Sequence, residues 1–358
     1  MAATQASTHL TTPGLTTPGL VDAHIHPDKS SWGAPWLSRK PAANLAELIE
    51  NDRASQFDFN MSVEERVYSL FEQAVANGTL ALRAHVDVSP ELGTTNVEGV
   101  RAAAERLSSF LTVQIVAFPQ FGLLTNPGTL DVMAASLDAG ADLVGGIDPV
   151  GVEGDLHGHL DAIFGVADSK GRDLDIHLHD GGEAGLEAIR EIATRTIATG
   201  RQGRVTIGHA FALCDESLPS LGQTLDLVAE AGVWIATCGL GADPVPNLAL
   251  LQERGVRVVA GSDGVRDTWS PFGTASMVDR AHLIAYRTGA LTDADLEHVF
   301  DLASRAGGEL LGVAEIADWA GPESDTRLEF AAENLAQLVV DRPAPLRVIR
   351  NGKEFIRE

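Results

Sequence analysis

Short apolar runs rich in Val and Ile alternate with longer segments of helical periodicity along most of the chain. The apolar runs predict eight strands, at 19–26, 79–88, 111–120, 141–147, 173–179, 204–210, 232–238 and 256–263. Between them, apolar residues spaced three and four apart predict helices, among them 63–76, 97–109, 130–139 and 184–198. Strands that are apolar throughout and separated by helices are typical of a parallel sheet covered on both faces. Eight such units in succession favour a (β/α)8 barrel over an open, doubly wound sheet.

The two ends of the chain fall outside this alternation. Residues 1–18 are mostly polar, and we expect an extended N-terminal lead-in there. We assign 19–312 to the barrel, with further helices at 274–289 and 293–312, and 313–358 to a C-terminal extension. Within that extension, 335–356 has strand-like patterning, and Arg350-Asn-Gly-Lys353 predicts a hairpin turn.

Composition and charge narrow the range of partners. The 358 residues are 44% hydrophobic and 21% charged, which is typical of a globular protein. The net charge of −24 repels phosphate backbones and anionic lipids, so neither nucleic acid nor a membrane is an expected partner. The two cysteines form no CxxC pair, no apolar run reaches the length of a membrane span, and the first residues do not resemble a secretory signal. We therefore expect a cytoplasmic protein that acts on a small molecule.

Polar residues gather at the carboxyl ends of the predicted strands, where barrels of this kind carry their catalytic groups. His24 and His26 end the first strand and share one face of it, because side chains two apart in a strand point the same way. Other strands carry or end in His85, Gln120, His177-Leu-His-Asp180, His209 and Asp263. One histidine at a strand end is most often structural, but several imidazoles and a carboxylate on separate strands suit zinc or ferrous iron. The pattern favours a metal hydrolase, and no glycine-rich motif indicates dinucleotide or P-loop chemistry.

The same residues carry a family resemblance. The string Gly-Leu-Val-Asp-Ala-His-Ile-His-Pro-Asp-Lys-Ser at 19–30 resembles the opening metal motif of the amidohydrolase superfamily. The segments 83–88, 116–120 and 261–273 are similar to the cytosine deaminase branch, which includes the N-alkylammelide aminohydrolases. The resemblance extends over roughly residues 19–312, and it rests on the ordered set of histidines and one aspartate on successive strands.

The resemblance implies a role for each strand-end residue. His24, His26, His177 and Asp263 would hold one divalent metal ion, Zn²⁺ or Fe²⁺, and His209 would orient the attacking water. Such an ion lowers the pKa of its water from about 15.7 toward about 7, so that hydroxide is available to attack at neutral pH. Asp263 would also accept the proton of that water and pass it to the leaving amine. Gln120 would read the edge of a heterocycle, and Trp269 would cover one side of a flat substrate.

Two positions depart from the cytosine deaminase pattern. Where that branch has a glutamate that carries a proton to the ring, this chain has Asp180, and where it has a second acid after the last aspartate, this chain has Gly264. Lys29 is then a second candidate acid or electrostatic stabiliser, beside Asp180, with His179 as a helper. Both departures affect recognition and proton transfer, and the sequence leaves the choice between Asp180 and Lys29 open.

A third departure concerns the ends of the chain. Relatives build a small β-sandwich from a longer segment before the first barrel strand together with the C-terminal tail. With only 18 residues before the barrel, we expect a reduced or partial sandwich here. A partial sandwich leaves an open strand edge, which a homo-oligomer could cover.

These expectations combine into a hydrolytic deaminase with a small heterocyclic substrate. It would use metal-activated hydroxide to remove an amino or alkylamino group from a planar nitrogen ring similar to cytosine, isocytosine or an aminotriazine. Two alternatives stay open: a cyclic amide hydrolase that opens a lactam or imide ring, and a barrel that binds metal but has lost catalysis. A deaminase releases ammonia or an amine, whereas the cyclic amidase creates a carboxylate.

Overall fold

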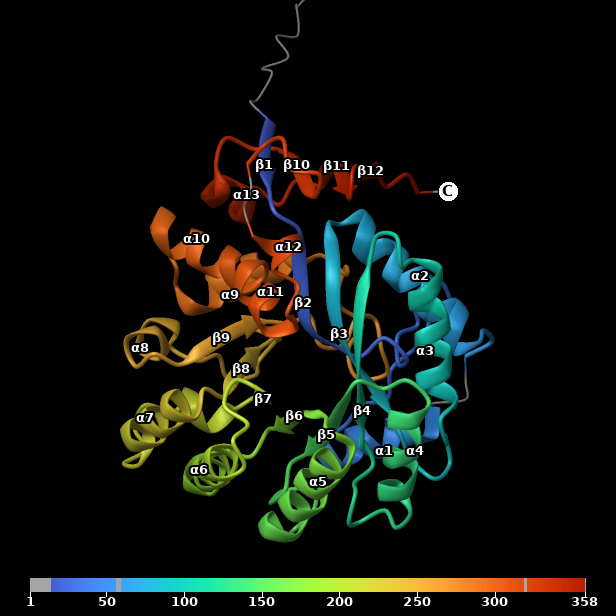
Figure 1. Cartoon of the computed structure of the whole chain (residues 1–358), viewed down its shortest axis with the longest axis vertical. Helices are drawn as coiled ribbons and strands as arrows, with labels where there is room; N and C mark the ends of the chain where they lie inside the picture. The colour runs from blue at the N-terminus through green and yellow to red at the C-terminus, as the bar shows by residue number, and fades with distance from the viewer. Residues whose placement is uncertain (1–13, 56–58, 319–320, 358) are drawn as a thin grey trace, which may run out of the picture.

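Eight parallel strands form a single sheet in which each strand pairs with the next one along the chain (Figure 1). The computed structural model describes residues 14–55, 59–318 and 321–357. The strands of this sheet are β2 (Leu20–Ile25), β3 (Thr79–Asp87), β4 (Thr112–Phe118), β5 (Leu143–Ile147), β6 (Asp173–Leu178), β7 (Val205–His209), β8 (Trp234–Thr237) and β9 (Arg257–Ala260). Helices follow most of them, and the predicted (β/α)8 barrel is confirmed.

The barrel closes where its first strand meets its last. Ile25 and Asp263 form a parallel bridge, and the Asp263 N–H donates to the His24 carbonyl over 2.7 Å. Below this bridge, the buried carboxylate of Asp22 accepts hydrogen bonds from the N–H groups of His24, over 3.2 Å, and Ser262, over 3.0 Å. The seam between β2 and β9 therefore carries three of the predicted metal ligands.

The helices form because their apolar faces pack on this sheet and their ends are capped. In α2, Ser62 and Glu65 form a capping box, and the predicted bounds are reproduced. The helices are α1 (Leu45–Ser55), α2 (Val63–Ala76), α3 (Thr95–Arg106), α4 (Thr129–Asp138), α5 (Leu156–Lys170), α6 (Gly182–Ala198), the 3₁₀ turn η1 (Phe211–Cys214), α7 (Leu221–Ala231), α8 (Leu248–Glu253), α9 (Met277–Thr288), α10 (Asp293–Leu302), α11 (Arg305–Leu311), α12 (Ala314–Ala317) and α13 (Leu335–Asp341). Within the described segments, none of them combines the length and apolar character of a membrane-crossing helix.

The chain ends build a second, antiparallel sheet of four strands. Its order is β1 (Gly14–Thr17), β10 (Arg327–Ala331), β11 (Pro345–Arg350) and β12 (Lys353–Glu354). Part of the expected lead-in, residues 1–13, lies outside the described residues, but Gly14–Thr17 is a paired strand rather than a lead-in. This sheet corresponds to the partial sandwich expected from the termini.

The C-terminal tail differs from its predicted strand pattern in one part. Leu335–Asp341 is helix α13, because the side chain of Asn334 caps its first turn by accepting the Gln337 N–H over 2.8 Å. The predicted hairpin is confirmed: Arg350 pairs with Lys353. The two residues between them, Asn351 and Gly352, have φ angles of 50° and 72°, as a tight hairpin turn requires.

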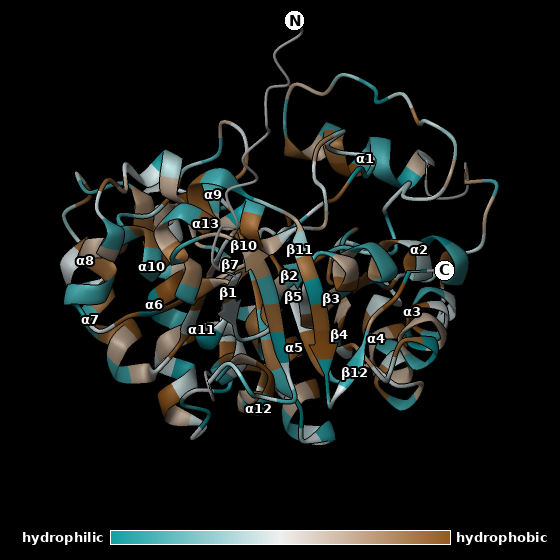
Figure 2. Cartoon of the chain, turned by 90° about the horizontal axis from the view of Figure 1, so that it is seen from above, coloured by the Kyte–Doolittle hydropathy of each residue, from teal (hydrophilic) through white to brown (hydrophobic). Residues whose placement is uncertain are grey.

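Helix α1 was not predicted, and it lies apart from the helices that surround the barrel (Figure 2). Its Asp52 is buried and accepts a hydrogen bond from the Thr268 hydroxyl, in the loop after β9. Leu45 and Leu48 of the same helix face a large cavity at the carboxyl ends of the strands. Helix α1 therefore forms one wall of the site described next.

Candidate active site

A cavity of about 1010 Å³ opens at the carboxyl ends of the barrel strands. Most of the residues predicted for the site line it, namely His26, Lys29, Gln120, His177, His209, Asp263 and Trp269. His24 is fully buried behind them. Asp180 is not among the residues that line the cavity.

Five imidazoles and one carboxylate converge at the base of the cavity. The Nε2 atoms of His26 and His177 lie 3.0 Å apart, and Asp263 Oδ1 lies 3.3 Å from His26 Nε2 and 3.7 Å from His24 Nε2. His85 belongs to the same cluster, with its ring centroid 4.0 Å from that of His24. Its Nε2 lies 3.1 Å from the buried carboxylate of Asp175, but neither atom makes a hydrogen bond in the described part of the chain, and His85 forms with His24 and His26 a group that could hold a metal ion.

The chemistry of this cluster fits a divalent cation. Among the described residues, His24 Nδ1 and Nε2 and His177 Nδ1 are buried without a hydrogen-bond partner. Burial, reinforced by the neighbouring imidazoles, holds the pKa of His24 and His177 well below the usual range, so both rings are neutral, as ligands must be. Burial alone would raise the pKa of Asp263, but the hydrogen bond to His26 and the nearby imidazoles hold it well below its usual range. Neutral imidazoles beside an ionised carboxylate are the donor set that zinc and iron prefer.

Small residues make room for His24 at the seam. A Cβ atom on Gly261 would lie 2.4 Å from the Cβ of His24, and one on Gly208 would lie 2.8 Å from its Cε1. Neither distance is tolerated between non-bonded carbon atoms, so both positions need glycine. The imidazole of His24 is thus fixed between β7 and β9 before any ligand binds.

Backbone strain is concentrated at the same strand ends. Asp148, His209 and Asp263 adopt φ angles of 26°, 67° and 57°, in the left-handed region that residues with a side chain rarely occupy. Each such residue costs about 1–3 kcal/mol and persists only where the surrounding structure enforces it. Asp148 directly follows β5, His209 ends β7 and Asp263 lies just after β9. Each of them contributes a side chain to the site.

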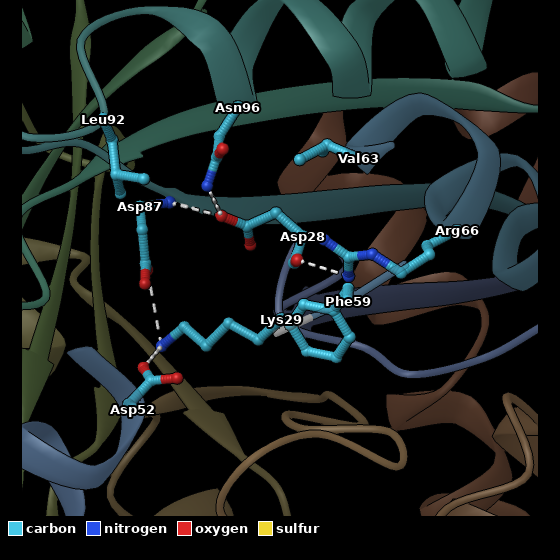
Figure 3. Close-up of a pocket in the computed structure, with 9 residues that line it drawn as sticks. All are labelled: Asp28, Lys29, Asp52, Phe59, Val63, Arg66, Asp87, Leu92 and Asn96. Carbon is cyan, nitrogen blue, oxygen red and sulfur yellow. Dashed lines mark hydrogen bonds and ion pairs between the residues drawn. The ribbon is translucent and has the colours of Figure 1, made fainter. Parts of the chain in front are cut away.

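Lys29 lies in a small chamber beside the main cavity (Figure 3). Its Nζ is 3.4 Å from Asp87 Oδ1 and 3.5 Å from Asp52 Oδ2, and it donates a hydrogen bond to the Gln120 Oε1 atom. Burial alone would lower the pKa of Lys29, but Asp87, Asp52 and Asp28 outweigh it and raise the pKa above the usual value. The ammonium group is therefore held as a permanent positive charge, which suits an electrostatic stabiliser better than a proton donor.

Two carboxylates of this chamber were missed by the sequence reasoning. Asp87 lies two residues after His85 on β3, so the strand period places both on one face, and this signal was available. Asp52 lies on α1, whose sequence carried no signal for the site. Asp28 was part of the opening motif, and its Oδ2 accepts the Asp87 N–H over 3.0 Å.

Asp180 bonds to a neighbouring loop and does not line the cavity. Its Oδ2 accepts the N–H groups of Val150 and Gly151, both over 3.2 Å, in the loop after β5. Burial raises the pKa of this half-buried carboxyl. In this arrangement Asp180 holds a neighbouring loop rather than facing a substrate.

His179 occupies the cavity wall instead. Its Nδ1 lies 2.7 Å from Asp148 Oδ2, and its ring stacks on that of His209 with 4.3 Å between centroids and 28° between planes. Burial alone would lower the pKa of His179, but Asp148 raises it, whereas burial lowers the pKa of His209 to about 4. The two stacked rings therefore differ: Asp148 favours the protonated form of His179, whereas His209 is neutral. The sequence had suggested His179 as a helper.

Asp267 occupies the space that a side chain at position 264 would need. A Cβ atom on Gly264 would lie 1.8 Å from Asp267 Oδ2. Asp267 Oδ1 accepts the N–H groups of Trp269, over 2.9 Å, and Ser270, over 2.7 Å, and so shapes the loop that carries Trp269. Trp269 in turn lies with its ring centroid 5.4 Å from Lys29 Nζ. Position 264 thus has no acid, but the carboxylate of Asp267 occupies the space beside it.

Comparison with known proteins identifies the family. The model of the amidohydrolase family matches residues 61–316. N-isopropylammelide isopropyl amidohydrolase of Pseudomonas sp. (strain ADP) is 32% identical over 351 residues, which cover 96% of this chain and 86% of that protein. N-isopropylammelide isopropylaminohydrolase from Burkholderia multivorans is 37% identical, and its crystal structure superposes with a TM-score of 0.90 over 95% of this chain and 86% of that one.

The fold extends to more distant enzymes. The crystal structure of 5-methylcytosine deaminase from Klebsiella pneumoniae shares it with a TM-score of 0.85 at 22% identity, over 100% of this chain and 91% of that one. Together with the clustered histidines and aspartate, these matches support a metal-dependent hydrolase that acts on carbon–nitrogen bonds. The chain belongs to the amidohydrolase superfamily, in its cytosine deaminase-like branch.

Proposed function

We propose that this protein is a hydrolytic deaminase that removes an amino or alkylamino group from a planar nitrogen heterocycle of the cytosine, isocytosine or aminotriazine kind. The observation that carries the proposal is the cavity itself, in which neutral imidazoles and Asp263 face Lys29, Gln120 and Trp269. The two relatives named for N-isopropylammelide support the choice of a ring that bears an alkylamino group.

His24, His26, His177 and Asp263 would hold one divalent ion, Zn²⁺ or Fe²⁺. When bound, the ion supplies Lewis acidity, which lowers the pKa of a water molecule toward neutrality. The unpartnered imidazole nitrogens described above are the groups that this assignment explains. Because the histidines are neutral and Asp263 is ionised, the protein need not change their protonation to bind the ion.

The residues of the cavity wall bind and orient the ring. Since Gln120 Oε1 accepts from Lys29, its amide NH₂ group is left to donate to an acceptor on the ring, such as a carbonyl oxygen. Trp269 covers one face of a flat substrate, and the fixed charge of Lys29 favours a ring on which negative charge develops.

Proton transfer falls to His209 and Asp263. His209 is neutral and has a buried Nε2 atom with no hydrogen-bond partner in the described part of the chain, so it can accept a hydrogen bond from the attacking water. Asp263 accepts the proton as the water oxygen bonds to the ring carbon, and returns it to the departing nitrogen. The carbon–nitrogen bond then breaks and releases ammonia or an alkylamine.

Product analysis on a small panel of heterocycles tests this proposal. Protein of known metal content is incubated with cytosine, isocytosine, ammelide and N-alkylammelides, and ammonia and alkylamine are quantified. We expect release from at least one compound, with loss of both metal and activity in His177→Ala. A ring-opened carboxylate product would show that the protein is a cyclic amidase and not a deaminase. Metal binding without any turnover of deaminase or cyclic amide substrates would indicate a barrel that has lost catalysis.

A second comparison separates Lys29 from Asp180. We expect Lys29→Met to lower kcat/KM by a factor of about 10²–10³, the size of effect seen when one electrostatic stabiliser is removed. Asp180→Asn should retain most of the activity, because Asp180 faces the loop at Val150 and Gly151. Lys170→Met is the matched control, since this lysine pairs with Asp138 on the outer helices. Loss of activity in Asp180→Asn with a functional Lys29→Met would assign the proton shuttle to Asp180.

A further inference from the structure

We propose that His209, Cys238 and Asp263 form a second cation site, specific for a soft or borderline divalent ion such as zinc or cadmium. Its occupation would inhibit the enzyme, because it takes His209 and shares Asp263 with the site proposed above. The inhibition rests on the proposed function, whereas binding of the ion does not.

Three neighbouring strands bring these residues together. His209 ends β7, Cys238 directly follows β8, and Asp263 follows β9 at the barrel seam. Parallel pairing of β7 with β8 and of β8 with β9 keeps their carboxyl ends side by side. One ligand atom from each side chain, a ring nitrogen, the sulfur and a carboxylate oxygen, lies within 4.8 Å of the other two. A cation can therefore reach all three with small side-chain movements.

Two of the three residues are buried, and one of them has an unpartnered nitrogen atom. His209 is 5% exposed, and its Nε2 atom has no hydrogen-bond partner in the described residues. Cys238 is 4% exposed, and Arg280 holds it in place by donating to its carbonyl oxygen over 2.6 Å. The Asp263 side chain is 18% exposed and lines the main cavity, which gives an ion a path from solvent.

The donor set selects the kind of ion. Sulfur, imidazole nitrogen and carboxylate oxygen together suit zinc and its softer analogue cadmium, whereas magnesium and calcium prefer oxygen ligands alone. When the ion binds, a metal–sulfur bond forms and the thiol proton is released to solvent, with no change of oxidation state. The Cys238 thiol has no part in the proposed reaction, so this site accounts for a cysteine at the edge of the catalytic cluster.

Cadmium titration of the metal-loaded protein tests the proposal. Cadmium bound per chain is measured by elemental analysis after desalting, and thiolate coordination by its ultraviolet charge-transfer absorption. Cys238→Ser is compared with the parent and with Cys214→Ser, which removes the other cysteine, in η1. We expect the parent and Cys214→Ser to take up one cadmium more than Cys238→Ser and to show the thiolate absorption. Their turnover should fall in step with that absorption, and turnover of Cys238→Ser should not.

Several results would overturn the site. They are equal uptake by Cys238→Ser, a thiolate absorption that disappears only in Cys214→Ser, or uptake of magnesium as strong as that of cadmium. Cys238→Ala serves as a second variant, with thermal unfolding to show that it folds. If the panel shows no deaminase activity, the absorption still decides the cadmium site, because the ligands proposed for the first ion include no cysteine. The experiment can therefore reject the cadmium site without rejecting the proposed deaminase function, and the reverse.

Discussion

At the scale of single residues, Asp267 couples the stability of the protein to pH. Burial raises the pKa of this carboxyl from 3.8 to about 6. The folded protein therefore binds its proton more tightly than the unfolded chain does. The contribution of Asp267 to the unfolding free energy is therefore fully present below about pH 4 and is lost as the pH rises through 6, in total about 3 kcal/mol at 1.36 kcal/mol for each pH unit.

Asp267→Asn should remove this pH dependence. An asparagine oxygen can still accept the N–H groups of Trp269 and Ser270, but the side chain no longer ionises. We expect the unfolding free energy of the variant, measured by urea denaturation at pH 4, 5, 6 and 7, to fall less steeply than that of the parent. In the control Asp215→Asn the slope should change slightly in the opposite sense, because hydrogen bonds from Ser217 lower the pKa of Asp215. Parallel curves for the parent and Asp267→Asn would contradict the assignment.

The residues of the site differ in how far the sequence could place them. His24, His26 and Asp263 were predictable, because strand alternation and barrel topology fix which way they point. The orientation of Asp180 was not, since it depends on two N–H groups of a loop about thirty residues earlier. The same holds for Asp52, which reaches Lys29 from a helix that packs there only in the folded protein.

At the scale of elements, α1 is attached to the barrel by few polar contacts, and one of them can be removed without touching the cavity wall. The Thr268 hydroxyl donates to Asp52, the residue through which α1 also reaches Lys29. Thr268→Val should loosen α1 and with it the wall formed by Leu45 and Leu48. We expect KM to rise about tenfold, the equivalent of 1.4 kcal/mol, with kcat changed far less.

Steady-state kinetics on the best substrate of the panel measure this effect. Thr94→Val is the matched control, because its hydroxyl donates to the Glu98 carboxylate on α3, away from α1 and from the residues that line the cavity. A fall in kcat with KM unchanged would mean that Thr268 acts on Lys29 and the chemistry, and that the position of α1 does not govern binding.

Element prediction succeeded where burial dictates the pattern. The barrel strands are buried on both faces, so their apolar runs are continuous and their bounds come out within a few residues. The helix at 335–341 was misread because Leu-Val-Val favours a strand locally, while the Asn334 cap and its packing against α10 decide for a helix. Helix α1 was missed because its amphipathic pattern is weak and it covers the cavity instead of the core.

At the scale of the whole molecule, the second sheet bears on association between chains. Its outer strands are short, four residues in β1 and two in β12, which limits edge-to-edge pairing. Apolar side chains are nevertheless exposed elsewhere, with Tyr286 at 82% and Leu291 at 89%. The homo-oligomer expected from the sequence stays a prediction, and sedimentation at several concentrations would check it.

Because the proposed metal ligands lie at the barrel seam, we expect metal removal to lower the stability of the whole barrel. The proposed ligands His24 and His26 come from β2 and Asp263 from the end of β9, so one ion would join the first and last strands of the barrel. An ion that binds only the folded state adds about 2.7 kcal/mol of stability at a concentration one hundred times its dissociation constant. We therefore expect a chelator to lower the Tm by several degrees in calorimetry, and zinc or ferrous iron to restore it. His26→Ala should unfold at the lower temperature with or without the chelator. If the chelator removes the metal but leaves the Tm of the unsubstituted protein unchanged, the seam is held by its hydrogen bonds alone.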